Sequence, residues 1–136
     1  MDVKICYKTY PFKITLGACK SFFDKTGLDL QTVFLKYINT YTSNRTLSVG
    51  DLLVVLCELY SRDIACKALH CMIKEEDKNI PIDEIEDGTF RVSWMQSDRD
   101  DNLSEPWPLV MVSTALQISD YFMKELNEKK SDISEG

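Results

Sequence analysis

The spacing of apolar residues between positions 30 and 41 is the sequence feature that most constrains this fold. The members of the set recur three or four residues apart: Leu30, Val33, Phe34, Tyr37, Ile38 and Tyr41. This spacing places all six on one face of an α-helix, and Asp29 precedes them as an N-cap. A helix with a continuous apolar face must pack on other elements, so the stripe predicts a core built from helices.

Four other segments carry helical patterns, which makes about five helices in all. These segments cover approximately 16–25, 48–60, 64–74 and 107–129. The segment after Ser48 is apolar on nearly all sides, so we expect this helix at the centre of the core. The last helix has one predicted apolar face, formed by Val112, Ala115, Leu116, Ser119, Phe122, Met123 and Leu126.

Helix boundaries are also predicted from single residues. Side chains suited to N-caps precede the predicted helices at Thr15, Ser48 and either Ser61 or Asp63. Gly27 is suited to end the first helix, because glycine readily adopts the left-handed conformation of a C-cap.

Two segments have the alternating pattern of strands. Residues 3–15 predict one or two short strands broken near Pro11, and residues 89–95 predict a strand with Phe90, Val92 and Trp94 on one face. Between them, the acidic segment 75–88 predicts at most one helical turn, at 82–85. The expected fold is therefore mainly α, a single helical domain over 1–130 with a minor N-terminal/central β-strand pair. The polar segment 131–136 is expected to be a disordered tail.

The charge of the chain is acidic overall and unevenly distributed. The net charge is −6; residues 1–50 hold seven Lys/Arg and three Asp/Glu, whereas residues 75–105 hold eleven Asp/Glu and three Lys/Arg. An acidic chain is a poor candidate for nucleic-acid binding, which depends on neutralising phosphates. The asymmetry would suit self-association or a basic partner, and ordinary solvated loops are the simpler interpretation.

The sequence also predicts a soluble protein. No apolar run approaches the roughly 18 residues needed to span a membrane, and the first residues lack a signal-peptide pattern. Five cysteines without a regular spacing are expected to be reduced thiols in the cytosol. We therefore predict neither membrane binding nor a disulfide scaffold.

Few residues suggest chemistry. Cys66 and His70 lie one helical turn apart, with Cys57 as a possible third ligand, but a structural zinc site needs four. Residues 98–102 resemble part of a calcium loop without its central glycine. The glycines are scattered singly, which excludes a phosphate-binding loop. The sequence thus predicts no enzyme, no catalytic residue, no cofactor and no metal, with a Cys/His metal-binding regulator as a minor alternative.

Apolar residues in excess of a small core favour a protein–protein contact instead. Aromatic residues are enriched at such interfaces. We expect the partner-binding residues to be Trp107, Val54 and Tyr121, with Trp107 as a surface anchor between two prolines.

Two motifs in the first half of the chain resemble a known family. Phe12-Lys13-Ile14-Thr15-Leu16-Gly17-Ala18 resembles the strand-to-helix opening of tail assembly chaperones of long-tailed bacteriophages and gene transfer agents. Ser48-Val49-Gly50-Asp51-Leu52-Leu53-Val54-Val55-Leu56 resembles their capped third helix. The chain departs from the pattern at Ser61-Arg62-Asp63, which replaces a glycine-rich turn, and 75–105 has no counterpart.

The resemblance implies a non-enzymatic protein of phage or prophage tail morphogenesis. Such chaperones coat the tape-measure protein, keep it soluble and give way to tail-tube protein. They tend to oligomerise, work in the host cytoplasm and are absent from the mature virion. The first alternative is a head–tail connector or completion protein, which would stay in the particle.

Overall fold

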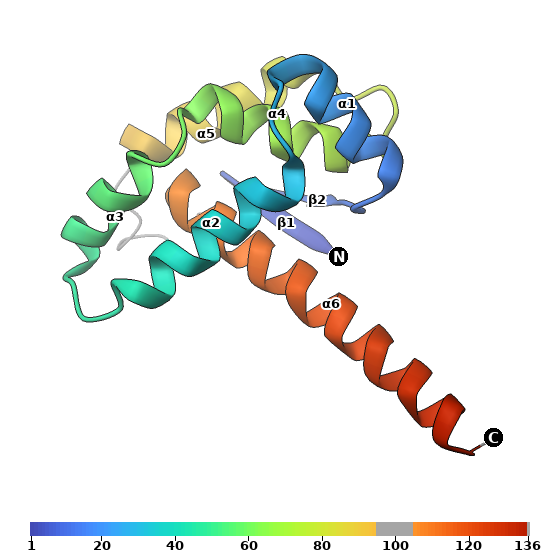
Figure 1. The fold of residues 1–136 in the computed structure, drawn as a ribbon. Helices are drawn as coiled ribbons and strands as arrows, with labels where there is room; N and C mark the ends of the chain where they lie inside the picture. The colour runs from blue at the N-terminus through green and yellow to red at the C-terminus, as the bar shows by residue number, and fades with distance from the viewer. Residues whose placement is uncertain (95–104, 136) are drawn as a thin grey trace.

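The fold is mainly helical, as the sequence predicts, with one small antiparallel sheet (Figure 1). The computed structural model describes residues 1–94 and 105–135. The elements within these residues are β1 (Asp2–Ile5), β2 (Lys8–Pro11), α1 (Leu16–Thr26), α2 (Leu30–Ser43), α3 (Val49–Cys57), α4 (Arg62–Ile73), α5 (Ile82–Trp94) and α6 (Trp107–Glu135).

The two strands form an N-terminal hairpin. Val3 pairs with Tyr10 and Ile5 with Lys8, so the chain reverses at Cys6, whose φ of 59° lies in the left-handed region. The expected break near Pro11 is therefore misplaced. Inward-facing Val3 and Ile5 are both buried, because alternate residues of a strand point to the same face.

The prediction of a second strand at 89–95 is wrong, because residues 82–94 belong to α5 and Met95 lies outside the described residues. The helix begins directly after Pro81, and Asp83 and Glu84 in its first turn interact favourably with its N-terminal dipole. Ile85 and Thr89, four residues apart, are buried together, whereas Phe90 is half exposed. The helical period therefore overrides the short alternating pattern.

Helix boundaries follow the predicted caps. The side chains of Thr15, Asp29, Ser48 and Ser61 each accept a hydrogen bond from the backbone N–H three residues later. Gly27 ends α1 with φ 72° and donates its N–H to the Phe23 carbonyl. These local signals confirm the four helix starts and the end of α1.

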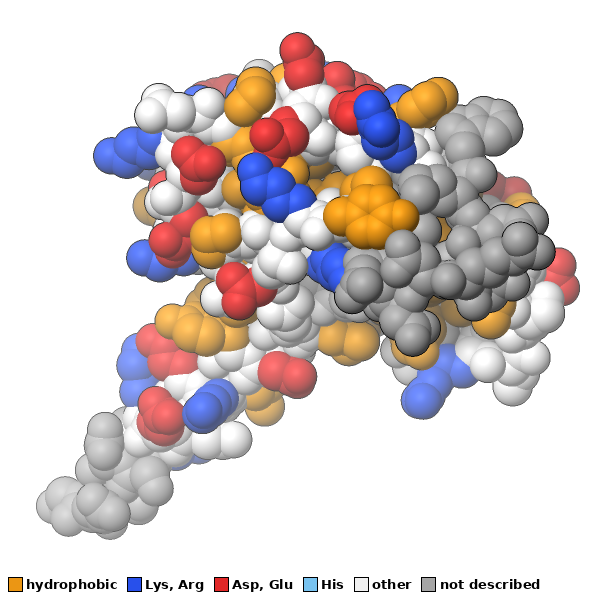
Figure 2. Space-filling view, turned by 180° about the vertical axis from the view of Figure 1, so that it is seen from behind, with side chains coloured by type: hydrophobic (Ala, Val, Ile, Leu, Met, Phe, Trp, Pro, Cys, Tyr) orange, Lys and Arg blue, Asp and Glu red, His pale blue; other side chains and the backbone are white. Residues whose placement is uncertain are grey.

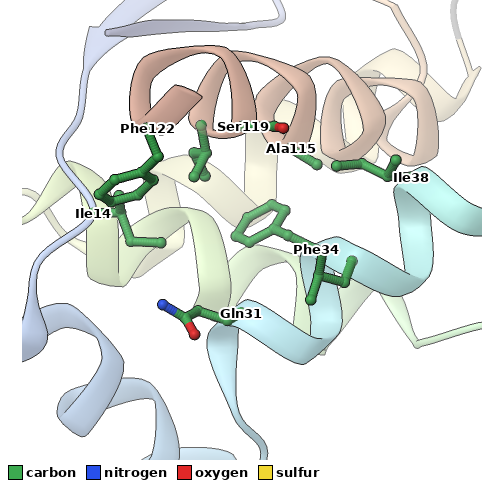
Figure 3. A pocket seen from close by; sticks show the side chains of 9 residues that line it. Ile14, Gln31, Phe34, Ile38, Ala115, Ser119 and Phe122 are labelled. Carbon is green, nitrogen blue, oxygen red and sulfur yellow. The ribbon is translucent and has the colours of Figure 1, made fainter. Parts of the chain in front are cut away.

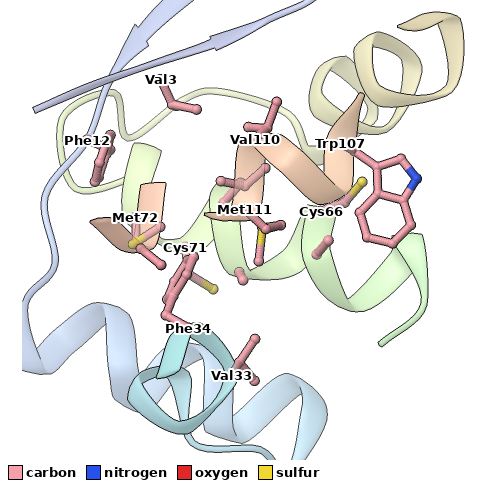
Figure 4. Packing of buried hydrophobic residues seen from close by; sticks show 14 of the residues in the cluster. Val3, Phe12, Val33, Phe34, Cys66, Cys71, Met72, Trp107, Val110 and Met111 are labelled. Carbon is pink, nitrogen blue, oxygen red and sulfur yellow. The ribbon is translucent and has the colours of Figure 1, made fainter. Parts of the chain in front are cut away.

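The centre of the core is α4 and not α3, contrary to expectation. Eight of the twelve residues of α4 are buried, including His70. Figure 4 shows Cys66, Cys71 and Met72 from this helix within the core. In α3 only Leu52 and Leu56 are buried, and α3 lies at one edge of the molecule (Figure 1). The helix α4 packs against α1, α5 and α6, which explains why more of its surface is buried than that of α3.

Basic side chains from residues 1–50 form ion pairs with acidic side chains from residues 75–105 in the folded protein. Lys8 pairs with Glu84 at 3.1 Å and Lys13 with Glu76 at 3.2 Å. The Thr15 hydroxyl also donates to Glu75. Part of the charge asymmetry in the sequence is thus satisfied between the N-terminal region and the acidic residues between α4 and the first turn of α5.

The last helix is longer than predicted and only partly embedded. It continues to Glu135, past the expected end near 129 and through most of the segment expected to form a tail. Val110, Met111, Thr114 and Ala115 are buried in its first half. Its second half projects from the body, as Figure 1 and the rear view in Figure 2 show.

Candidate partner-binding groove

A groove lies between α2 and α6 near the point where α6 leaves the body (Figure 3). Its volume is about 180 Å³. The lining residues are Ile14 from the segment before α1, Gln31, Phe34, Leu35 and Ile38 from α2, and Ala115, Ile118, Ser119 and Phe122 from α6. The groove thus combines residues more than 80 positions apart in the sequence.

The groove is apolar and uncharged. Phe34 and Ile118 form buried parts of its lining, whereas Leu35 and Phe122 are exposed at its rim. Among the described residues, Gln31 and Ser119 are the polar members of the lining, and no Asp, Glu, Lys or Arg belongs to it. Uncharged, concave apolar surfaces of this kind are suited to the apolar face of a helix.

The groove continues onto the projecting half of α6. Of the apolar face predicted for this helix, Val112 and Ala115 are buried against the body. The remaining members are exposed and define what we term the α6 strip: Leu116, Ser119, Phe122, Met123 and Leu126. The predicted face is therefore only partly right, because Leu116 and Ser119 are exposed although Ile118, which lies between them and was not predicted, is buried.

The three residues predicted to bind a partner lie in different environments. Trp107 is only 9% exposed, at the end of α6 that packs on α4, so its predicted position at the surface is wrong (Figure 4). Pro106 and Pro108 flank this residue at the start of the helix, where proline is tolerated. Val54 is 59% exposed on α3 and does not line the groove. Tyr121 is exposed, and its ring meets that of Phe122 edge-on at 5.4 Å.

Gln31 and Leu35 belong to the groove but escape the sequence analysis. Leu35 stands beside the predicted apolar stripe of α2, and it is 56% exposed. A leucine at an off-stripe position of an otherwise amphipathic helix is the signal that could have identified it. A single exposed leucine is common in soluble proteins. Its place in the lining of the groove, and not its exposure, is therefore what makes Leu35 a candidate site residue.

The cysteine and histidine residues do not form a metal cluster. The Cys66 thiol lies 3.1 Å from the Thr89 hydroxyl, and His70 Nε2 donates to the Ile80 carbonyl at 2.9 Å. Cys57 is exposed on α3. No group of three or more His, Cys, Asp or Glu side chains in the described part of the chain is arranged to hold a metal ion. The calcium-like segment 98–102 lies outside that part.

The chemistry of Cys66 also argues for a structural thiol. Burial raises the pKa of this thiol, and its hydrogen bond with Thr89 and the nearby Arg62 only partly oppose the effect. A thiol with a raised pKa is a weak nucleophile, because the thiolate is the reactive form.

A cluster of polar side chains from β2 and α5 joins this helix to the hairpin. The Tyr10 hydroxyl donates to Glu84 Oε2 at 2.6 Å, and Lys8 Nζ lies 3.1 Å from the same oxygen. The hydrogen bond from Tyr10, followed by that from Lys8, lowers the pKa of Glu84. Burial, and then the same hydrogen bond, raises the pKa of Tyr10. This cluster joins β2 to α5, and none of its three residues lines the groove.

The comparisons with known proteins identify no relative. No protein-family model matches the chain, and neither the curated proteins nor the solved structures yield a significant match. Within the described ranges, no helix is both long enough and apolar enough to cross a membrane. The fold and the groove thus define a mainly helical protein with an N-terminal hairpin and an exposed apolar surface beside a groove.

Proposed function

We propose that this protein is a phage or prophage tail assembly chaperone that binds and solubilises the tape-measure protein during tail morphogenesis. The observation that carries the proposal is the uncharged groove between α2 and α6 and its continuation along the α6 strip. A tape-measure protein is long and helical, and an amphipathic helix docks into an apolar groove through residues spaced three or four apart.

The dimensions and chemistry of the groove support a helical client. A volume of about 180 Å³ suits one or two large apolar side chains. The neighbouring strip offers further apolar contacts along the helix axis. Because the lining is uncharged, recognition would depend on apolar burial, which is suited to holding many similar client helices rather than one defined sequence.

The two sequence motifs of the chaperone family supply the second line of support. They include Thr15 and Ser48, which act as helix caps here, as the motifs require. Under this proposal the protein is not an enzyme, works in the host cytoplasm, forms homo-oligomers, gives way to tail-tube protein and is absent from the mature virion.

Co-expression with the tape-measure protein of the same gene cluster tests the proposal. We expect the tape-measure protein to become soluble and to co-purify with this chain. Leu35→Glu should abolish both effects, because a charge at the groove rim must lose its hydration when a client helix docks.

Phe23→Glu is the matched control. Phe23 is an apolar residue of α1 that is 58% exposed, close to the 56% of Leu35, and it does not line the groove. This variant should behave as wild type. A tape-measure protein that remains insoluble and unbound with the wild-type chain, or equal capture by Leu35→Glu, would rule the proposed groove function out.

Mass spectrometry of purified particles separates a chaperone from a virion component. A chaperone should be missing from particles that contain tape-measure and tail-tube proteins. Detection of the chain in stoichiometric amounts would favour a connector or completion protein instead.

A further inference from the structure

A positive charge follows the α6 strip along the projecting part of the helix (Figure 1). Within the strip, successive members of one series are three and four positions apart: Leu116, Ser119, Met123 and Leu126. Lys130 continues this series, because it comes four positions after Leu126, and it is exposed. Residues spaced in this way share one face of a helix, so Lys130 lies on the side of α6 that carries the strip.

The other charged residues of this part of the helix do not continue the series. Between residues 119 and 130 they are Asp120, Lys124, Glu125, Glu128 and Lys129. At about 100° per residue, Lys124 and Glu128 lie about 120° or more around the helix from Lys130. Glu125 pairs with Lys129 at 3.7 Å. In the part of the chain that the structure describes, Lys130 has no ion pair.

A lysine at this position restricts what can dock on the strip. Its methylene stem can lie along the apolar surface while the ammonium group stays hydrated. A helix that covers the strip removes water from the ammonium group, and this cost is offset when that helix places a carboxylate beside it. A basic residue in the same place would repel the lysine. The charge therefore discriminates between client helices that bury equal apolar area.

We propose that the α6 strip selects client helices whose apolar series ends in an acidic residue, which pairs with Lys130 when the helix docks. The inference rests on the proposed function and adds the class of client segment that the groove and the strip accept. A single lysine in an apolar seam between helices specifies the register of the two helices at a cost in stability. Lys130 thus sets the register of the client helix.

The distance from the groove to Lys130 determines where the acidic residue of the client lies. Ser119 lines the groove and comes 11 residues before Lys130. This separation corresponds to about 16 Å along the helix axis, or three turns. A client helix that runs along α6 has the same rise per residue. Its acidic residue is therefore expected about 11 residues from the apolar side chain that enters the groove.

The net charge of the chain predicts the opposite preference. At −6, the chain as a whole attracts basic peptides and repels acidic ones. Salt at about 0.1 M screens exposed charges that are more than about 10 Å apart, so a contact with Lys130 dominates under those conditions. Tighter binding of an acidic helix would consequently report the local contact and not the overall field.

Fluorescence anisotropy with two synthetic helical peptides tests the inference on the full chain. Both peptides carry leucines spaced three and four apart between two charged residues, which are glutamates in one peptide and lysines in the other. Each charged residue is about 11 residues from the leucine at the far end of the series, so one of them meets Lys130 in either orientation. At about 0.1 M salt, the wild type should bind the glutamate peptide at least about threefold more tightly.

Two variants assign the preference to one side chain. Lys130→Glu should reverse the preference, because the contact with glutamate becomes repulsive. Lys124→Glu is the matched control, since it makes the same charge change at an exposed lysine of the same helix, about 120° away from Lys130. This control should keep the wild-type preference. Circular dichroism checks that both variants retain the helix content of the wild type.

Several results would overturn the selection by Lys130. They are equal binding of the two peptides, tighter binding of the lysine peptide, no binding of either, an unchanged preference in Lys130→Glu, or a reversal in Lys124→Glu as well. The proposed function fails separately. If the tape-measure protein is solubilised but the peptides bind equally, the acidic preference alone is wrong. If the glutamate peptide is preferred but the tape-measure protein stays insoluble and unbound, the assigned client alone is wrong.

Discussion

Gly88 of α5 lies directly against Ile5 of β1. A Cβ atom at position 88 would stand 2.9 Å from Ile5 Cγ2, closer than side chains pack. The helix can therefore approach the hairpin only because residue 88 has no side chain. This glycine is helical and its φ is not positive, so the requirement is for space and not for backbone freedom.

Gly88→Ala should consequently destabilise the protein, although alanine is the better helix former. The clash should cost about 1–3 kcal/mol, which outweighs a helix-propensity gain of about 1 kcal/mol. Urea unfolding measures the difference. Gly50→Ala in α3 is the control, because no atom lies within 4 Å of its added Cβ. Equal stability of Gly88→Ala and Gly50→Ala would show that the hairpin yields to the methyl group.

Glu84 should make the stability depend on pH. Its pKa is lowered by the hydrogen bonds from Tyr10 and Lys8, so the folded state favours the ionised form. This contribution is present above the unfolded-state pKa and is lost as the pH falls through the folded one. Glu84→Gln should thus be less stable than wild type at neutral pH, and the difference should shrink below the ordinary value of 4.5. Urea unfolding on both sides of that pH tests this, and a constant difference would contradict it.

Substitution of Trp107 should lower the free energy of unfolding strongly, whereas substitution of Val54 should hardly change it. Trp107→Ala removes a buried indole and should cost about 3–5 kcal/mol of unfolding free energy. Val54→Asp changes an exposed side chain and should alter stability by no more than about 0.5 kcal/mol. Chemical denaturation compares the two. A stable Trp107→Ala variant would show that the indole contributes little packing.

The cysteines should differ in reactivity. Cys57 is exposed, whereas Cys66 and Cys71 are buried in α4. Burial raises the pKa of both the Cys57 and the Cys66 thiol, so access to the reagent, and not the pKa, separates them. A thiol reagent should therefore label Cys57 rapidly in the folded protein and reach the two α4 cysteines only after unfolding. Mass spectrometry of labelled peptides gives the rates, with Cys57→Ser as the control. Rapid native labelling of Cys66 would mean that α4 opens readily.

Much of the secondary structure could be predicted from the sequence, because its signals are local. The caps at Thr15, Asp29, Ser48 and Ser61 need only the next three residues to act. The stripe of α2 is likewise a property of one segment. The prediction of a strand at 89–95 was wrong because its alternating pattern covers only a few residues. These residues belong to a longer helix that already begins after Pro81.

The candidate site could be predicted only in part. Phe122 was placed on the correct face of its helix, but nothing in the sequence distinguishes it from Val112, which is buried on that same face. The difference depends on where α6 leaves the body, and hence on the packing of α2. The choice of Trp107 failed for a similar reason, since a large aromatic residue suits a core and an interface equally well.

The sequence by itself determined the helices α1 to α4 and α6, most of their boundaries and the absence of a regular disulfide pattern, because propensity, capping and periodicity act over a few residues. Only the tertiary structure decided that α4 is central, that Lys8 and Lys13 meet Glu84 and Glu76, and that a groove opens between α2 and α6. Those outcomes depend on the shapes and volumes of side chains that are distant in the chain and come together only when the helices pack.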